Sequence, residues 1–290
     1  MKKIAITGTI TALVTPFDKK GTVDFDALKK LIDFQIENGV EGICVCGTTG
    51  ESATLTIKEK QAIIVKTVEY VNGRVLVIAG TGANETNLTR DLTLIAKEHG
   101  ADAALIVAPY YNKPSQDGLY EHYHVVAEQV DIPQIIYNIP GRTAVNILPS
   151  TIIKLAENHP NIVAVKEASG DLDQMMQIIK NSPDHFKLLS GDDALTIPVI
   201  SIGGKGVVSV LSNYVPKKFG DCVRLALKGK FADALKIHYE LFDLMDLNFI
   251  ESNPVPVKYI LSQMGLTNDT IRMPLHTLKN ENKKRIKQEL

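Results

Sequence analysis

The sequence predicts a closed (β/α)8 barrel followed by a C-terminal helical extension. Three observations lead to this fold class: eight short apolar runs rich in β-branched residues, helical patterns between them, and glycines where helices give way to strands. A near-continuous apolar run is typical of a parallel strand that is buried on both faces. We expect strands at residues 10–14, 42–46, 75–79, 103–108, 134–137, 162–166, 187–189 and 206–210.

The segments between these runs have helical spacing. In the first of them Leu28, Leu31 and Ile32 form an apolar stripe, and Asp24 is placed to cap the helix. Glycines close the first three helices, at residues 39, 73 and 100. Eight such units favour a closed barrel, the TIM-barrel architecture, over an open doubly wound sheet. No GxGxxG motif follows the first strand, which weakens the dinucleotide-binding alternative.

The chain changes character after the eighth expected strand. From about residue 216 onward only helices are expected, at 216–228, 230–247, 254–264 and 280–289. We therefore divide the chain into a barrel of residues 1–228 and an extension of residues 229–290, with no flexible linker between them.

The composition excludes several classes of function. Lys+Arg 32 against Asp+Glu 33 gives a formal net charge of −1, which does not suggest nucleic acid as a partner. No apolar stretch approaches the roughly 18 residues of a membrane span. The N-terminal segment has a charged start but a weak apolar core, so we expect no signal peptide.

The three cysteines indicate a reduced, cytoplasmic setting. Cys44 and Cys46 alternate along one expected strand and should share a face, while Cys222 is far away in the sequence. They form no disulfide framework, and no His or Cys nearby completes a zinc spacing. We expect small buried hydrophobic residues and no metal.

Polar residues follow several expected strands. In a parallel barrel the carboxyl ends of all strands meet at one mouth, so these residues should lie close together. They are GTTGE at 47–51, PYYN at 109–112, YNIPGRT at 137–143, Lys166, and SGDD at 190–193. Asp192 and Asp193 are placed to cap a helix that starts near Ala194, and residues 203–206 should form a tight turn into the last strand.

Lys166 is the most informative residue because it ends an apolar strand. An ammonium there costs several kcal/mol unless it is paired or neutral. A lysine stem that reaches the water at the sheet rim is the plain alternative. The other polar strand ends favour a Schiff-base site instead, since a neutral amine attacks carbonyl compounds. A phenol such as that of Tyr137 can move the protons, and Arg142 suits a substrate carboxylate.

At these positions the chain resembles the dihydrodipicolinate synthases, pyruvate-dependent class I aldolases related to N-acetylneuraminate lyase. The resemblance runs from about residue 7 to 275. The motifs that carry it are TPF at 15–17, GTTGE at 47–51, GTG at 80–82, PYY at 109–111, YNIPGRT at 137–143, VKEA at 165–168 and NPVPVK at 253–258.

The resemblance implies roles for the catalytic residues. Lys166 would form an imine with the keto carbon of pyruvate, and Tyr137 would act as the general acid and base. Thr48 would link Tyr137 to Tyr111 in a proton relay. Members of the family draw this second tyrosine from a neighbouring subunit, so the active unit would be at least a dimer.

The resemblance also implies how the substrates bind. Thr49 would hold the pyruvate carboxylate, and Arg142 the carboxylate of L-aspartate 4-semialdehyde. Gly191 and Val208 fall at further substrate-binding positions. The implied reaction is the first committed step of diaminopimelate and lysine biosynthesis, without a cofactor or metal. The expected assembly is a homotetramer built as a dimer of dimers.

Two alternatives stay open. A sister aldolase that acts on sialic acid or a keto-deoxy sugar acid would keep the lysine and tyrosine, but such relatives usually lack the Gly-Arg-Thr after the Tyr-Asn-Ile-Pro. Arg142 and the Thr48-Thr49 pair therefore favour the synthase. A non-catalytic barrel should have lost Lys166 or Tyr137, and both are present.

The resemblance also bears on inhibition by lysine. Lysine-sensitive members usually place Glu at the position of Leu88, and His at the positions of Ile57 and Lys60. Leu88 offers a bound ammonium no counter-charge, and Lys60 adds a like charge. We therefore expect weak or absent inhibition by free L-lysine.

Overall fold

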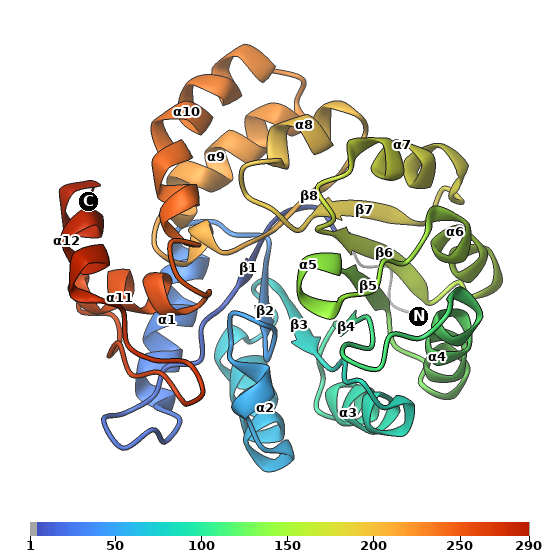
Figure 1. Ribbon diagram of the computed structural model, residues 1–290, viewed down its shortest axis with the longest axis horizontal. Coiled ribbons are helices and arrows are strands. Elements are labelled where there is room, and N and C mark those ends of the chain that lie inside the picture. Colours follow the sequence, from blue (N-terminus) through green and yellow to red (C-terminus); the bar gives the residue numbers. More distant parts are fainter. Residues whose placement is uncertain (1–4, 290) are drawn as a thin grey trace.

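The computed structural model of the chain describes residues 5–289 and contains a closed barrel of parallel strands in the order β1 to β8 (Figure 1). The barrel predicted from the sequence is therefore confirmed. Residues 1–4, the charged start of the segment considered above as a signal peptide, lie outside the described residues. The strands are β1 (Gly8–Ala12), β2 (Gly42–Val45), β3 (Leu76–Gly80), β4 (Ala103–Val107), β5 (Gln134–Asn138), β6 (Ile162–Glu167), β7 (Lys187–Ser190) and β8 (Gly206–Ser209).

The first strand begins two residues earlier than expected. Leu13 and Val14, which the sequence placed in the strand, leave the sheet and pack in a buried cluster against the C-terminal helices.

The barrel closes where β1 pairs with β8. A glycine is required there, because a Cβ at Gly206 would lie 2.0 Å from the carbonyl oxygen of Gly8.

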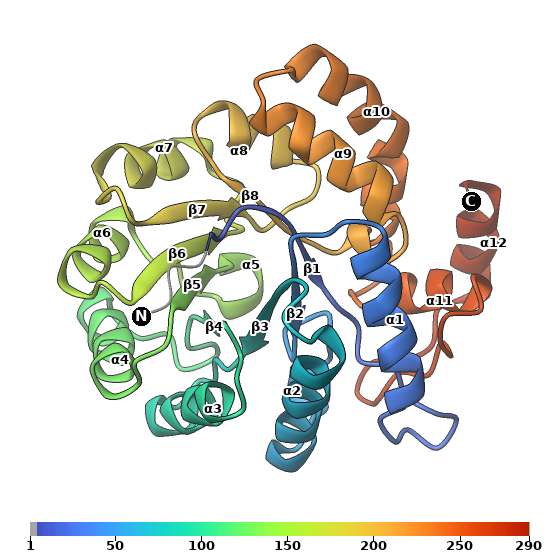
Figure 2. The ribbon, with the colours of Figure 1, turned by 180° about the vertical axis from the view of Figure 1, so that it is seen from behind.

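Helices surround the barrel, as Figure 2 shows from behind. Asp24 caps α1 as predicted, since its carboxylate accepts a hydrogen bond of 2.9 Å from the backbone of Ala27. The glycines at 39, 73 and 100 adopt positive φ angles of 77°, 71° and 85°. The surrounding helices are α1 (Phe25–Glu37), α2 (Ile57–Val71), α3 (Thr86–Glu98), α4 (Gln116–Gln129), α6 (Pro149–Asn158), α7 (Leu172–Asn181), α8 (Thr196–Ser201) and α9 (Pro216–Leu227).

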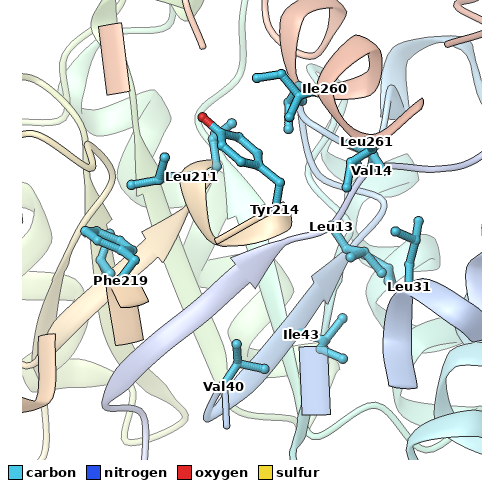
Figure 3. Packing of buried hydrophobic residues seen from close by; sticks show 14 of the residues in the cluster. Leu13, Val14, Leu31, Val40, Ile43, Leu211, Tyr214, Phe219, Ile260 and Leu261 are labelled. Atoms are coloured by element: carbon cyan, nitrogen blue, oxygen red, sulfur yellow. The ribbon is translucent and has the colours of Figure 1, made fainter. Parts of the chain in front are cut away.

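The C-terminal helices lie against one side of the barrel. They are α10 (Phe231–Leu247), α11 (Val255–Gln263) and α12 (Asn280–Glu289), and their expected positions are confirmed. Ile260 and Leu261 of α11 belong to the same buried cluster as Leu13 and Val14, as Figure 3 shows. This shared core fixes α11 beside the mouth of the barrel. Within residues 5–289, no helix has the length and apolar character needed to cross a membrane.

Two local expectations were wrong. Cys44 faces the barrel interior, whereas Cys46 packs in the outer cluster, because its backbone turns to a left-handed φ of 55° just after β2 ends. Asp193 does not cap a helix: α8 begins only at Thr196, without a side-chain cap. The Asp193 carboxylate instead accepts hydrogen bonds from the backbone of Val210 and Leu211, at 3.1 and 2.8 Å.

Candidate active site

Polar residues that follow β2, β4 and β5 line a cavity of about 620 Å³ at the carboxyl end of the barrel. Its wall combines the loop after β2, the short helix α5 (Pro140–Thr143) and the turn before α11. The lining residues used below are Thr48, Ile57, Lys60, Leu88, Tyr110, Tyr137, Arg142 and Asn253. Three of the predicted polar segments thus meet at one cavity, and Lys166 at the end of β6 is paired in register with the lining residue Tyr137.

Lys166 and Tyr137 are paired in register on the neighbouring strands β6 and β5. Both are buried, at 6% and 5% exposure, and the Lys166 Nζ lies 4.1 Å from the centre of the Tyr137 ring. The amine forms no ion pair with any residue from 5 to 289. Burial raises the pKa of the nearby Cys44 thiol to about 11, so this thiol stays neutral and does not compete as a nucleophile. The arrangement places one amine and one phenol together, both largely buried.

Gly191 and Val208 lie close to this pair. A Cβ at Gly191 would come within 2.6 Å of the Ala168 Cβ and 3.2 Å of the Lys166 Cε, so only glycine leaves the space beside the lysine stem open. Val208 is buried in the barrel interior, in the same cluster as Tyr137. Gly191 is therefore next to Lys166, and Val208 shares the interior cluster of Tyr137.

The loop after β2 carries Thr48 and Thr49. Thr48 lines the cavity together with Tyr137. Thr49 is buried, and its hydroxyl accepts a hydrogen bond of 2.9 Å from the side-chain amide of Asn253. Glu51 closes the loop in a left-handed conformation, with its backbone nitrogen donating to the carbonyl of Thr48 at 3.0 Å.

Arg142 lies on α5, lines the cavity and is exposed. A buried network fastens the strand ends that lead into α5. Asn138, the residue after Tyr137, donates to Glu167, the residue after Lys166, and accepts a 3.0 Å hydrogen bond from the backbone of Ile147. The segment that carries Arg142 is therefore held at both of its ends.

Tyr111 is the one predicted catalytic residue that does not join the others within this chain. Its side chain is 88% exposed, its φ is 76°, and it lies outside the set of cavity-lining residues. Tyr110, its neighbour, does line the cavity. A relay from Thr48 and Tyr137 to Tyr111 is thus not formed by one copy of the chain.

Sequence analysis did not identify the roles of Asn253, Lys258 and Glu51. All three are buried, and the Lys258 Nζ forms an ion pair of 2.5 Å with Glu51. The motif NPVPVK at 253–258 contained the signal, since an Asn and a Lys flank an apolar run there. Their partners lie about 200 positions away in sequence, at 204 and 207 residues, so the pattern alone did not indicate the contact.

Among the described residues, one group outside the cavity has the composition of a metal site. His124, Glu128 and His159 bring their potential ligand atoms within 4.8 Å of one another, on the outer surface between α4 and α6. The two rings contact at 3.0 Å, and the other nitrogen of His159 faces Glu128 at 3.3 Å. The three side chains therefore contact one another directly.

The fold and the site together define a lyase of the class I aldolase type: a barrel with a buried lysine on its sixth strand and a tyrosine beside it on the fifth. Residues 5–290 match the Dihydrodipicolinate synthetase family. The chain therefore belongs to this family. The expected family and the expected enzyme class are confirmed.

Individual relatives agree with this assignment over nearly the whole chain. A 4-hydroxy-tetrahydrodipicolinate synthase of Syntrophotalea carbinolica is 50% identical over 276 residues, which are 95% of this chain and 94% of the relative. A crystal structure of dihydrodipicolinate synthase from Aquifex aeolicus has a TM-score of 0.96 and 48% identity, and covers 98% of this chain and 96% of that chain. A structure described as the first monomeric dihydrodipicolinate synthase variant has a TM-score of 0.95 and 38% identity, over 98% of this chain and 95% of that chain. The synthase activity expected from the sequence is thereby confirmed.

Proposed function

We propose that this chain condenses pyruvate with L-aspartate 4-semialdehyde through an imine on Lys166. The observation that carries the proposal is the Lys166 amine itself, which is buried, has no ion-pair partner in the described part of the chain and lies 4.1 Å from the ring of Tyr137. A lysine that only reached solvent at the sheet rim would extend its amine to water. This amine is instead enclosed beside a phenol that can serve as acid and base.

The chemistry begins when the Lys166 Nζ attacks the keto carbon of pyruvate. Tyr137 moves the protons that let water leave, which yields the imine. Loss of a proton from the pyruvate methyl carbon gives the enamine, and this carbon attacks the aldehyde of the second substrate. The amine of that substrate then attacks the imine carbon. This step closes the ring and releases Lys166 unchanged.

Two sites for carboxylates complete the proposal. Thr49 and the backbone N–H groups of its turn hold the pyruvate carboxylate, because such N–H groups form an anion site and the neighbouring Thr48 lines the cavity together with Tyr137. Arg142 binds the carboxylate of L-aspartate 4-semialdehyde with its planar guanidinium, at the more exposed end of the cavity. Gly191 and Val208 shape the space next to the lysine stem.

The assembly is part of the proposal. Thr48 connects Tyr137 to the partner subunit's Tyr111, because the exposed Tyr111 of one chain cannot complete its own site. We therefore propose a homotetramer arranged as a dimer of dimers, in the cytoplasm.

The division into a barrel of residues 1–228 and an extension of residues 229–290 is supported by the position of α10 to α12 outside the ring of helices (Figure 1).

A coupled assay tests the substrates directly. The purified chain is given pyruvate with L-aspartate 4-semialdehyde in one series and N-acetylneuraminate in another. We expect turnover in the first series only. Cleavage of N-acetylneuraminate with no condensation would favour the sister aldolase and contradict the proposal.

A further inference from the structure

The turn before α11 reaches into the active site through a single buried hydrogen bond. We propose that Asn253, which belongs to the C-terminal extension, is a positioning residue that orients the hydroxyl of Thr49 towards the pyruvate carboxylate. This inference rests on the proposed function, because it assumes that Thr49 binds that carboxylate. It extends the proposal by assigning the extension a part in substrate binding.

The direction of the hydrogen bond carries the argument. The Asn253 Nδ2 donates to the Thr49 Oγ1 over 2.9 Å, and the two side chains are 5% and 3% exposed. A hydroxyl has one proton to donate. Because the Thr49 oxygen accepts from Asn253, its own proton is directed elsewhere. Asn253 and Thr48, the partner and the neighbour of Thr49, both line the cavity, so we assign an anionic substrate group there as the acceptor of this proton.

A buried ion pair fixes the turn that carries Asn253. Lys258, on the first turns of α11, pairs with Glu51 at 2.5 Å and donates to the carbonyl of Thr270 at 2.8 Å. The second oxygen of Glu51 accepts from the backbone of Arg272 at 3.0 Å. Glu51 lies two residues after Thr49. The extension therefore holds the loop after β2 at two nearby points, and the Asn253 amide cannot drift from Thr49 without breaking a buried ion pair.

Simple space filling does not account for an asparagine at this position. The Oδ1 of Asn253 is buried and has no hydrogen-bond partner among residues 5–289. An unpaired buried carbonyl is unfavourable, and an apolar side chain would avoid it. The donation to Thr49 is the interaction that only the amide supplies.

A double-mutant cycle tests the inference. Thr49→Val, Asn253→Ala and the double variant are compared with the parent for KM of each substrate and for kcat. We expect each single variant to raise KM for pyruvate about 10-fold, the effect of one hydrogen bond to a charged group, with little change in KM for L-aspartate 4-semialdehyde. The KM of the double variant for pyruvate should not exceed that of Thr49→Val, because both changes remove the same oriented hydroxyl.

Two further variants keep the test decisive. Asn253→Asp preserves the shape, but its carboxylate accepts the Thr49 proton and repels an anion. It should raise KM for pyruvate more than Asn253→Ala does, by about 100-fold. Asn268→Ala removes another asparagine of the extension, whose amide only contacts the Phe17 carbonyl at 3.5 Å, and should leave both KM values unchanged.

Several outcomes would overturn the inference. One is a KM for pyruvate in Asn253→Asp that equals that of the parent. Another is a double variant in which the increases in KM of the two single variants multiply. A third is an equal increase in KM for both substrates. An unchanged KM for pyruvate in Thr49→Val would remove the carboxylate role of Thr49 and this inference with it. Failure of the proposed function as a whole would show differently, as the absence of condensation in the parent chain.

Discussion

Asn138 and Glu167 face each other across β5 and β6, one residue beyond Tyr137 and Lys166, and the Asn138 amide donates to both carboxylate oxygens at 3.2 and 3.0 Å. Glu167 also accepts from the backbone of Ser169 and the side chain of Gln174. Its side chain is fully buried, and burial raises its pKa. This network fixes the strand ends that carry the two reactive side chains.

Replacing Glu167 by Ala should destabilise the fold and reduce catalysis together. The change leaves several buried donors unpaired, and we expect the free energy of unfolding to fall by about 3 kcal/mol or more. The value is measured by urea unfolding, and kcat is measured on the folded fraction. Glu157→Ala, at an exposed position of α6, is the control and should stay within about 0.5 kcal/mol of the parent. Equal stability of the two variants would show that the network is not structurally important.

The ion pair between Glu59 and Arg272 predicts how stability depends on acid. The hydrogen bond from Arg272 lowers the pKa of Glu59 from 4.5 to about 2. The folded pKa lies below the unfolded one, so the pair stabilises the fold above about pH 4.5 and loses this effect as the pH falls towards 2. Because the pair is partly exposed, we expect only about 1 kcal/mol. The stability difference between parent and Glu59→Gln, measured from pH 6 to 2, should shrink across that window, and a constant difference would contradict the assignment.

Arg142→Ala should impair the second substrate more than the first. Arg142 is exposed and lines the cavity, so its contact with a substrate carboxylate should be among the weaker ion pairs of this kind. We expect a loss of about 2 kcal/mol in binding free energy, which is roughly 30-fold in kcat/KM for L-aspartate 4-semialdehyde. Imine formation with pyruvate alone, followed by trapping, should change little. Equal losses in the two assays would mean that Arg142 supports the pyruvate site or the fold.

Free L-lysine should inhibit weakly or not at all. Ile57, Lys60 and Leu88 line the same cavity, and none provides a counter-charge for an ammonium. Glu85, the nearest substitute in sequence, is engaged in capping α3, where it accepts from the backbone of Asn87 and Leu88 at 2.8 and 2.6 Å. A lysine titration of initial rates checks this expectation. Strong inhibition of the parent at sub-millimolar lysine would refute it, and Leu88→Glu is the variant expected to gain sensitivity.

The sequence predicted what depends on local pattern. All eight strands lie within two residues of the predicted positions, because buried parallel strands leave near-continuous apolar runs. The barrel then brings Tyr137, Thr48 and Arg142 to one cavity and pairs Lys166 with Tyr137. The first strand was misplaced because Leu13 and Val14 are equally apolar but bury against the C-terminal helices.

What the sequence did not predict depends on long-range contacts or on single backbone angles. The left-handed φ of Cys46 reverses the face of its side chain, and no pattern of apolar residues indicates such a turn. Asp193 had a plausible local role as a cap, but its hydrogen bonds go to the end of β8. The contact between Asn253 and Thr49 joins segments 204 residues apart, and only the packing of α11 against the barrel brings them together.

The most direct test of the central claim is trapping of the imine on Lys166. Pyruvate plus borohydride should inactivate the parent chain and leave a reduced pyruvyl adduct on the peptide that contains Lys166, as seen by mass spectrometry. Lys166→Ala should fold, form no adduct and lose most activity, whereas Lys180→Ala, at the end of α7, should behave as the parent. Absence of an adduct, or an adduct on any other lysine, would contradict the account.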